Sequence, residues 1–374
     1  MMKIALITPF PPYRGGISTH SKNLYDILSL ENQVVVYNFS RQYPGFLFPG
    51  KTQYDNSIIA DDSHIIRALD SINPLTWKKV ANSIIKNKFD KVIFRFWNPF
   101  FTFSYISIIK RLKKNNNIQV YSICDNIIPH EKMILDQFLI KNFLDRLDGI
   151  IVMSSTTEKE ILHLDKSYNY KKIYLPMINN LGKPLDSSIS KKQIGLEQDE
   201  KVFLFFGLIR DYKGLDILLH AINKLDLNLF NKSKFLIVGE SYENIDKYKK
   251  ILDKDKKSSV KWITEYIPDD NINLFFSAAD YVVLPYKRAS QSGIIPMAYY
   301  FGKPVITSKI KGLEEIVING STGCTFDKLD IDALANVLEN CIKNKINIDM
   351  KKIEEFKNKL STENFVKELI SFIK

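Results

Sequence analysis

The hydrophobic residues of the chain fall into short runs rich in β-branched and aromatic side chains, and these runs alternate with longer stretches of helical spacing. Such alternation is typical of βα units that build mostly parallel sheets. The strands expected in the first half cover residues 3–8, 33–38, 91–96, 119–124, 149–153 and 172–175. Those of the second half cover 202–206, 234–238, 260–264, 281–284 and 304–307, with helices near 214–224 and 331–344. The pattern predicts an α/β fold with two successive sheets.

The strand and helix pattern restarts after residues 176–193, a stretch with two prolines, Gly182 and a serine cluster that we interpret as a linker. The chain has 374 residues, which is more than the about 100–200 that one core usually organises. We therefore expect a first domain over 1–180, a second over 181–360, and a C-terminal helix over 361–374 that can pack back on the first domain.

Composition indicates a folded globular protein, because 45% of the residues are hydrophobic and 25% are charged. The three cysteines stand far apart, which suits a reducing compartment and provides neither a disulfide framework nor a zinc spacing. The longest stretches without a charged residue, 96–109 and 289–302, are fourteen residues each, short of the roughly 20 that span a bilayer. The chain starts directly with a predicted strand rather than a signal peptide. We expect a cytoplasmic protein without a transmembrane helix.

The net charge is +11, and residues 1–180 hold 23 Lys and Arg against 15 Asp and Glu. Such an excess attracts nucleic acid, anionic lipid or a phosphorylated substrate, or it is an ordinary lysine-rich surface. Nucleic acid has only the charge in its favour, since no RNA or DNA motif accompanies it. The aromatic residues Phe100, Phe101, Phe103 and Tyr105 precede the basic run 110–114. They predict contact with an anionic membrane face or a lipid-diphosphate acceptor, and the alternative is a core helix with a basic end.

Two loops have the composition of phosphate sites. Gly15 and Gly16 follow the first strand and open a helix, so bare backbone N–H groups and the positive end of the helix dipole can meet an anion there. A tight turn without a ligand would need the same glycines. In the second half, Arg210 and Lys213 follow a buried strand and precede a helix. A guanidinium and an ammonium together suit a diphosphate.

A third loop, Ser290-Gln291-Ser292-Gly293, lies after a predicted strand and before an apolar helix. Backbone donors, hydroxyls and an amide at such a place can form an anion-binding nest. The serines could also be plain helix caps. The G-x-G-x-x-G and G-x-x-x-x-G-K-[ST] motifs of dinucleotide and P-loop proteins are absent from the sequence.

Taken together, several stretches resemble family 4 glycosyltransferases of GT-B fold. They are Gly15-Gly16 with His20, the turn from Gly207 to Gly214, Phe301-Gly302-Lys303-Pro304-Val305-Ile306, and Gly312-Leu313-Glu314-Glu315-Ile316-Val317. Their order and spacing match the family over nearly the whole chain. The resemblance implies two Rossmann-like domains facing each other across a cleft, a nucleotide-sugar donor held mainly by the second, an acceptor held by the first, and transfer with retained anomeric configuration.

The sequence departs from the family pattern at three places. The family's arginine after the glycine is Leu208 here, so Arg210 must reach the diphosphate from two residues further on. The family's two glutamates, the second of which binds the donor ribose, align with Ala289 and Met297. Relatives resemble C-H-N-x-x-P-H-E where this chain has Cys124-Asp125-Asn126 and then Pro129-His130-Glu131.

The resemblance and the chemistry of these residues give the candidate site. Asp125 and His130 are the candidate catalytic residues, because a polar cluster at a strand's carboxyl end can bind a reacting hydroxyl; His130 could instead cap the next helix. The candidates for sugar binding are Glu131, Asn126, Ser290 and Gln291. Those for the donor diphosphate are Arg210, Lys213, Gly15, Gly16, Ser292 and Gly293.

Two D-x-D sequences are the natural candidates for a metal site. Asp253-Lys254-Asp255 lies in a charged run and Asp330-Ile331-Asp332 starts a helix, so we expect a surface segment and a cap. The protein's own cations are then expected to stabilise the departing diphosphate, with neither a metal nor a cofactor beyond the nucleotide-diphosphate sugar. We predict a glycosyltransferase of surface polysaccharide or glycolipid synthesis. The alternative is a nucleotide-sugar-binding protein that has lost catalysis.

Overall fold

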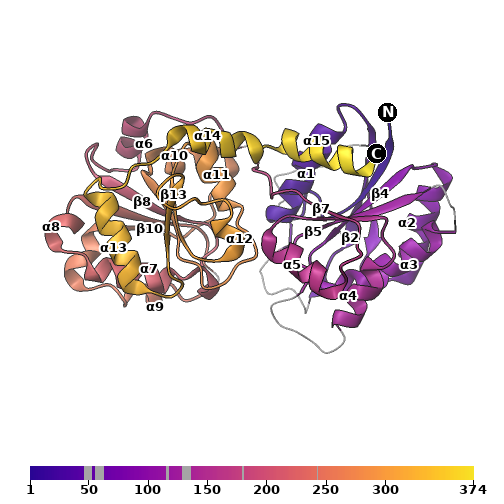
Figure 1. The fold of residues 1–374 in the computed structure, drawn as a ribbon, viewed down its shortest axis with the longest axis horizontal. Coiled ribbons are helices and arrows are strands. Elements are labelled where there is room, and N and C mark those ends of the chain that lie inside the picture. The colour runs from indigo at the N-terminus through magenta and orange to yellow at the C-terminus, as the bar shows by residue number, and fades with distance from the viewer. Residues whose placement is uncertain (46–52, 55–62, 115–117, 129–135, 179–180, 242) are drawn as a thin grey trace. The chain divides into compact units, whose positions relative to one another are not determined.

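The computed structural model of the chain describes residues 1–45, 53–54, 63–114, 118–128, 136–178, 181–241 and 243–374 (Figure 1). These residues form two compact units, and the C-terminal segment belongs to the first. Unit 1 is Met1–Pro176 with Ser361–Lys374, and unit 2 is Met177–Leu360.

Unit 1 is built on a sheet of seven strands in the order β3-β2-β1-β4-β5-β6-β7, and neighbouring strands pair in parallel. The strands are β1 (Lys3–Ile7), β2 (Gln33–Arg41), β3 (Ile65–Asp70), β4 (Lys91–Phe96), β5 (Gln119–Cys124), β6 (Gly149–Val152) and β7 (Tyr170–Lys172). Ile4 of β1 pairs with Val34 on one side and with Lys91 on the other. The strand order reverses between β1 and β4, and open α/β sheets bind ligands at the carboxyl ends beside such a reversal.

Helices cover both faces of this sheet (Figure 1). They are α1 (Gly16–Leu28), α2 (Pro74–Lys86), α3 (Thr102–Leu112), α4 (Asp136–Leu144), α5 (Ser155–Leu164) and α15 (Thr362–Ile373), with a 3₁₀ turn, η2, at Pro99–Phe101. Apolar residues of α2, α3 and α4 share one core with one side of the sheet, and those of α1 and α15 share the core of the other side. Asn73 starts α2 by accepting a hydrogen bond from the Leu75 amide.

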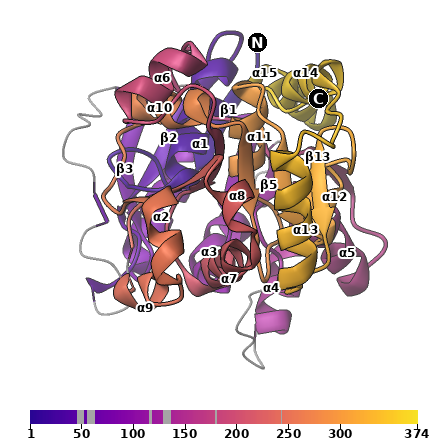
Figure 2. The same ribbon diagram turned by 90° about the vertical axis from the view of Figure 1, so that its left-hand side faces the viewer.

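Unit 2 repeats the plan with six parallel strands in the order β10-β9-β8-β11-β12-β13. The strands are β8 (Lys201–Phe206), β9 (Ser233–Val238), β10 (Val260–Ile263), β11 (Tyr281–Leu284), β12 (Val305–Ser308) and β13 (Gly323–Phe326). The helices are α6 (Ser187–Gln193), α7 (Leu215–Lys224), α8 (Leu227–Phe230), α9 (Asp246–Lys249), α10 (Asp269–Ala278), α11 (Ile294–Tyr300), α12 (Lys311–Glu314), α13 (Ile331–Ile342) and α14 (Met350–Lys359), with 3₁₀ turns η3 (Asp211–Lys213) and η4 (Lys254–Ser259). Figure 2 shows α13 beside α7, against which it packs. The order reverses between β8 and β11.

The predicted α/β class with two parallel sheets is confirmed, and β4, β5 and β11 have the expected bounds. Four differences concern the strands β3, β7 and β13 and the predicted linker. The sequence pattern missed β3 and β13, and it placed the last strand of unit 1 at 172–175, whereas β7 is Tyr170–Lys172. β3 and β7 lie at the sheet edges and are partly exposed, so their sequences need no continuous apolar run. In β13, Gly323 lies so close to β12 that a β-carbon would stand 2.0 Å from the Val305 oxygen.

The segment predicted as a linker, 176–193, ends in the helix α6, which packs against α10 within unit 2. The aromatic residues at 100–105, for which we expect membrane or acceptor contact, do not all lie on one surface. Phe101 and Tyr105 are 0% exposed in the core of unit 1, whereas Phe103 is 62% exposed. Helical spacing explains the split, because residues two apart on a helix lie on different faces. In the described part of the chain, no helix has both the length and the apolar character needed to cross a bilayer.

Candidate active site

The carboxyl ends of β8 and β11 lie next to each other at the strand reversal of unit 2, and glycines bring their loops together. Gly214, with φ of +67°, lies where a β-carbon would stand 1.9 Å from the Pro285 oxygen. A β-carbon on Gly239, after β9, would stand 2.2 Å from the Gly207 oxygen. The Lys287 amide donates to the Tyr212 oxygen at 2.8 Å. These contacts join the loop after β8 to the loop after β11, so side chains from both can meet one ligand.

Lys213 is a buried cation in the first of these loops. It is 8% exposed, and no carboxylate among the described residues forms an ion pair with it. Burial lowers the pKa of the Lys213 ammonium to about 8, and the nearby Arg210 guanidinium adds to this lowering. Arg210 precedes the 3₁₀ turn that contains Lys213. The structure therefore brings both predicted diphosphate ligands together, and two neighbouring cations suit an anionic ligand.

The second loop adds a buried tyrosine that sequence reasoning missed. The Tyr286 ring centroid lies 5.8 Å from Lys213 Nζ, and its hydroxyl lies 3.4 Å from Ser292 Oγ. Tyr286 therefore links the predicted residues Lys213 and Ser292. Its position directly after an apolar strand and Pro285 was the only signal in the sequence.

The other predicted residues of this loop also lie in unit 2. Ser290 and Ser292 are 9% and 8% exposed, and Gln291 is half-buried. Gly293 has a right-handed helical backbone at the start of α11, and Ser292 Oγ accepts from the Ile294 amide at 3.3 Å. Ser292 thus acts as a helix cap, and its hydroxyl also lies beside Tyr286.

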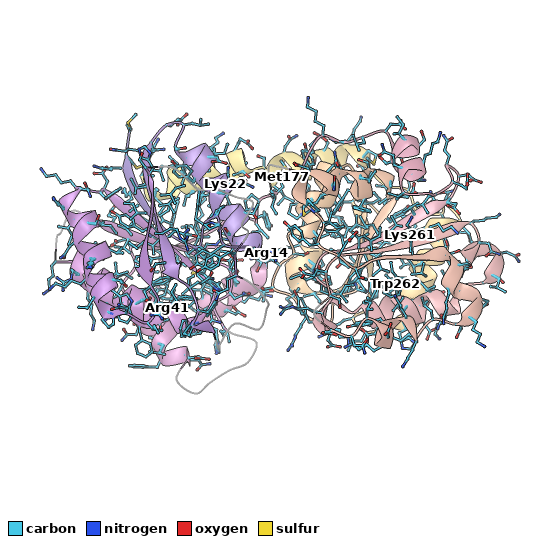
Figure 3. The ribbon with its side chains drawn as sticks, turned by 180° about the vertical axis from the view of Figure 1, so that it is seen from behind. Arg14, Lys22, Arg41, Met177, Lys261 and Trp262 are labelled. Carbon is cyan, nitrogen blue, oxygen red and sulfur yellow. The ribbon has the colours of Figure 1, made fainter. Side chains whose placement is uncertain are left out.

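Gly15 and Gly16 are exposed at the start of α1 in unit 1. Gly15 has φ of +111°, a left-handed conformation that favours glycine. Buried hydrogen bonds hold this loop in place. Asn38 of β2 donates to the Phe10 oxygen at 2.9 Å, and Thr8 Oγ1 lies 2.5 Å from Ser21 Oγ. Arg14 lies on the same loop (Figure 3). The glycine amides are thus held at the strand reversal of unit 1.

Asp125 follows β5 and forms a buried ion pair that the sequence did not predict. Arg95, in β4, donates from Nε to Oδ2 of Asp125 at 2.6 Å and from Nη2 to Oδ1 at 2.5 Å. Arg95 and Asp125 are 3% and 6% exposed. The signal in the sequence was an arginine within the otherwise apolar run Val92–Phe96. A buried charge at such a position needs a partner, which Asp125 provides.

His20, on α1, completes this group. Its Nδ1 lies 2.6 Å from Arg95 Nη1, and Nδ1 must accept because a guanidinium has no acceptor. Burial lowers the pKa of His20 well below its usual value, and Arg95 adds to this effect. The ring is therefore neutral with its proton on Nε2, which has no hydrogen-bond partner among the described residues. Phe365 of α15 packs edge to face against the ring.

Two of the predicted residues, His130 and Glu131, lie outside the described residues. Asn126 is half-buried next to Asp125. The structure thus groups Arg210, Lys213 and Ser292 in unit 2, and places Asp125, Asn126, Gly15 and Gly16 in unit 1. Arg95 joins the unit 1 set as a new member.

The predicted roles of the two D-x-D sequences can be compared with their surroundings. Asp330 caps α13 by accepting from the Ala333 amide at 2.8 Å. Asp253 and Asp255 are exposed at the turn η4. No group of three His, Cys, Asp or Glu residues with the arrangement of a metal site occurs among the residues that the structure describes.

Comparisons with known proteins agree with this architecture. Residues 186–360 match the family model described as glycosyl transferases group 1. An uncharacterized glycosyltransferase of Methanocaldococcus jannaschii is 23% identical over an alignment of 376 residues, which covers 98% of this chain and 96% of the relative.

Two solved structures show the same fold over the whole chain. Sucrose-phosphate synthase from Thermosynechococcus elongatus superposes with a TM-score of 0.77 at 18% identity and covers 100% of this chain and 98% of that one. HepE from Anabaena, in complex with UDP, gives a TM-score of 0.75 at 17% identity and covers 100% and 99%. The chain has the GT-B fold, and its residues 186–360 are similar to the glycosyl transferases group 1 family.

Proposed function

We propose that the protein transfers a sugar from a nucleotide-diphosphate donor to a glycan or lipid-linked acceptor, with retention of anomeric configuration. The observation that supports the donor is Lys213, a buried ammonium without a carboxylate partner among the described residues, at the strand reversal of unit 2 beside Arg210. A diphosphate supplies the missing negative charge. The UDP in the HepE structure is consistent with this choice of ligand.

Arg210 and Lys213 would also stabilise the leaving group. As the bond from the anomeric carbon to the diphosphate oxygen breaks, negative charge grows on that oxygen, and preorganised cations in a buried site lower the energy of this state. Metal ions serve that purpose in many phosphate sites. We infer that the two side chains take over this role and that transfer is metal-independent. Ser292, Gly293, Gly15 and Gly16 are further candidates for contacts with the phosphates.

Retention needs the acceptor oxygen to replace the diphosphate on the same face of the sugar. In the proposed step, the bond from the anomeric carbon to the leaving oxygen breaks, and the acceptor oxygen forms its bond there. The acceptor proton passes to the departing phosphate oxygen. No protein nucleophile is required, so the protein's part is to bind, orient and stabilise charge.

We place the sugar contacts of unit 1 at the carboxyl end of β5, through Asp125, Asn126 and the segment with His130 and Glu131, and those of unit 2 at Ser290 and Gln291. Both oxygens of Asp125 already accept hydrogen bonds from Arg95. Because Arg95 holds both oxygens, we assign Asp125 the role of orienting this strand end, and the departing phosphate takes the acceptor proton. The pathway we propose is surface polysaccharide or glycolipid synthesis on the cytoplasmic side of the membrane.

Thermal shift with UDP tests the donor site. UDP should raise the melting temperature of the wild type, since a ligand that binds only the native state stabilises it. The variants Arg210→Gln and Lys213→Met should lose most of this shift. Lys256→Met is the matched control, because Lys256 is also buried in unit 2 but donates to the Leu225 oxygen. Equal UDP shifts in all four proteins would reject the site.

A nucleotide-sugar-binding protein without transfer activity is the second candidate. Met297, which aligns with the family's second glutamate, is 4% exposed and packs as an apolar side chain of α11. A thioether cannot replace the hydrogen bonds of a carboxylate. Turnover with a panel of nucleotide sugars separates the two candidates. UDP binding without any transfer would favour the second.

A further inference from the structure

The outer surfaces of α2 and α3 form one basic face. From Ser71 to Lys114 the chain has ten Lys and Arg residues and one acidic residue, Asp90. The two helices pack against each other on one side of the unit 1 sheet (Figure 1). Asp90 lies in the loop before β4 and accepts from the Lys3 amide at 2.7 Å. The helices themselves contain no acidic residue.

Six lysines of this face are exposed, and only one of them has an acidic partner among the described residues. The exposed set is Lys78, Lys79, Lys86, Lys110, Lys113 and Lys114. Lys113 pairs with Asp148 at 2.5 Å. None of the other five forms an ion pair with a carboxylate in the described part of the chain. Apart from Lys113, the exposed lysines of this face are therefore not neutralised by ion pairs among the described residues.

Apolar side chains are exposed at one end of the same face. Leu75 is 69% exposed in the first turn of α2, and Phe103 is 62% exposed in the first turn of α3. Ile72, just before α2, is 46% exposed. Both helices follow parallel strands, so their first turns lie at the same edge of the sheet. Exposed aliphatic and aromatic side chains on a face of lysines are costly in water and gain free energy in a lipid interface.

A half-buried aromatic group lies at that edge too. Trp97 donates from Nε1 to the Tyr43 hydroxyl at 3.0 Å, and the Tyr43 ring stacks on Phe100 at 5.6 Å. All three side chains are half-buried. Tryptophan and tyrosine have apolar rings with a polar tip, the character that favours the boundary between lipid headgroups and hydrocarbon.

We propose that the face of α2 and α3, with Ile72, Leu75 and Phe103 as apolar contacts and the lysines as charge contacts, docks on an anionic lipid bilayer. Each lysine near such a surface adds to binding, and the gain is screened by salt. Lysine stems can lie along the apolar residues while the ammonium groups reach the headgroups. The proposal deepens the proposed function, on which it rests for the lipid-linked acceptor, because docking would bring unit 1 to a membrane-embedded substrate.

Co-sedimentation of the full chain with vesicles tests the proposal. The vesicles contain phosphatidylcholine, alone or with phosphatidylglycerol. Binding should require the anionic lipid and weaken as salt rises. The variant Lys78→Gln, Lys79→Gln, Lys110→Gln, Lys114→Gln should bind about 100-fold more weakly. Its control, Lys250→Gln, Lys254→Gln, Lys257→Gln, Lys345→Gln, removes the same charge from exposed lysines of unit 2 and should bind as the wild type does.

A second pair of variants tests the apolar contacts. Leu75→Ser with Phe103→Ser should weaken vesicle binding, whereas Ile189→Ser with Leu227→Ser, which are 56% and 47% exposed in unit 2, should not. Equal binding to neutral vesicles, no binding at low salt, or equal losses in the test and control variants would overturn the proposal. The proposal would also be overturned if the protein bound RNA but not vesicles and if this RNA binding depended on the same lysines. UDP thermal shifts of the same variants should stay at the wild-type value, so a failed donor site and a failed docking face give different results.

Discussion

Gly207 lies next to the ammonium group of Lys213. A β-carbon on residue 207 would stand 2.8 Å from Lys213 Nζ, and the glycine has φ of +100°. Gly207 directly follows β8, and Lys213 belongs to the turn before α7. The glycine therefore does two things: it turns the chain at the strand end, and it leaves room for the cation that we assign to the donor diphosphate.

Gly207→Ala should displace the Lys213 ammonium and weaken UDP binding by about tenfold or more, while the protein still folds. The left-handed backbone adds a cost on the order of 1–2 kcal/mol. Gly320→Ala is the control, because Gly320 has φ of +73° with nothing within 4 Å of a built β-carbon. Isothermal titration with UDP and urea unfolding would measure both effects. Similar UDP affinities in the two variants would mean that the position of Lys213 does not matter for the ligand.

Lys213→Met should stabilise the ligand-free protein and remove most of its response to UDP. Burial lowers the Lys213 pKa from 10.5 to about 8, so at pH 7 the folded protein holds a charge that its surroundings disfavour. Methionine removes this penalty, so the free energy of unfolding should rise by ~1–3 kcal/mol. The unfolded chain binds more protons than the folded one between about pH 8 and 10.5, so wild-type stability rises with pH there and the advantage of methionine shrinks. Urea unfolding at several pH values measures this difference.

The same shift predicts how UDP binding depends on pH. The diphosphate needs the charged ammonium, so wild-type affinity should fall as pH rises through about 8. Lys213→Arg keeps its charge over this range and should give a flatter profile. A wild-type affinity that is constant up to about pH 9 would place the phosphate away from Lys213.

Much of this site could be predicted from the sequence, since Arg210 and Lys213 stand together in a turn after an apolar strand. Local spacing was enough to place them at one strand end. Tyr286 and Gly207 could not be assigned from local pattern, because their contacts with Lys213 join segments more than seventy residues apart or depend on backbone approach. The short edge strands β3 and β7 were missed or misplaced for a related reason. Their place is fixed by pairing with β2 and β6 rather than by their own hydrophobic runs.

Transfer activity should survive excess EDTA. In the proposed mechanism Arg210 and Lys213 supply the positive charge that a divalent cation would otherwise provide, and Asp330 is occupied as the cap of α13. Sugar transfer from the donor that proves active, measured with EDTA and again after adding magnesium or manganese, checks this expectation. Activity that disappears with EDTA and returns with either metal would show that the two side chains are not sufficient.

Replacing Arg95 and Asp125 together should destabilise the protein less than the two single replacements added together. Removing one partner leaves the other charge buried at 3% or 6% exposure, and such losses cost about 3–5 kcal/mol. Asp125→Leu leaves Arg95 with His20, which is neutral because burial lowers its pKa. Arg95→Met removes the two charged Arg95 donors from the Asp125 carboxylate. The double variant Arg95→Met, Asp125→Leu removes both charges at once. Urea unfolding should therefore show a loss of unfolding free energy well below the sum of the two single losses.

Sugar transfer should be weak in all three variants, because they alter the strand end that we assign to orienting the sugar, while UDP binding in unit 2 should persist. Additive stability losses would show that the ion pair contributes nothing beyond its separate members, and wild-type transfer in the stable double variant would remove the end of β5 from the proposed sugar site.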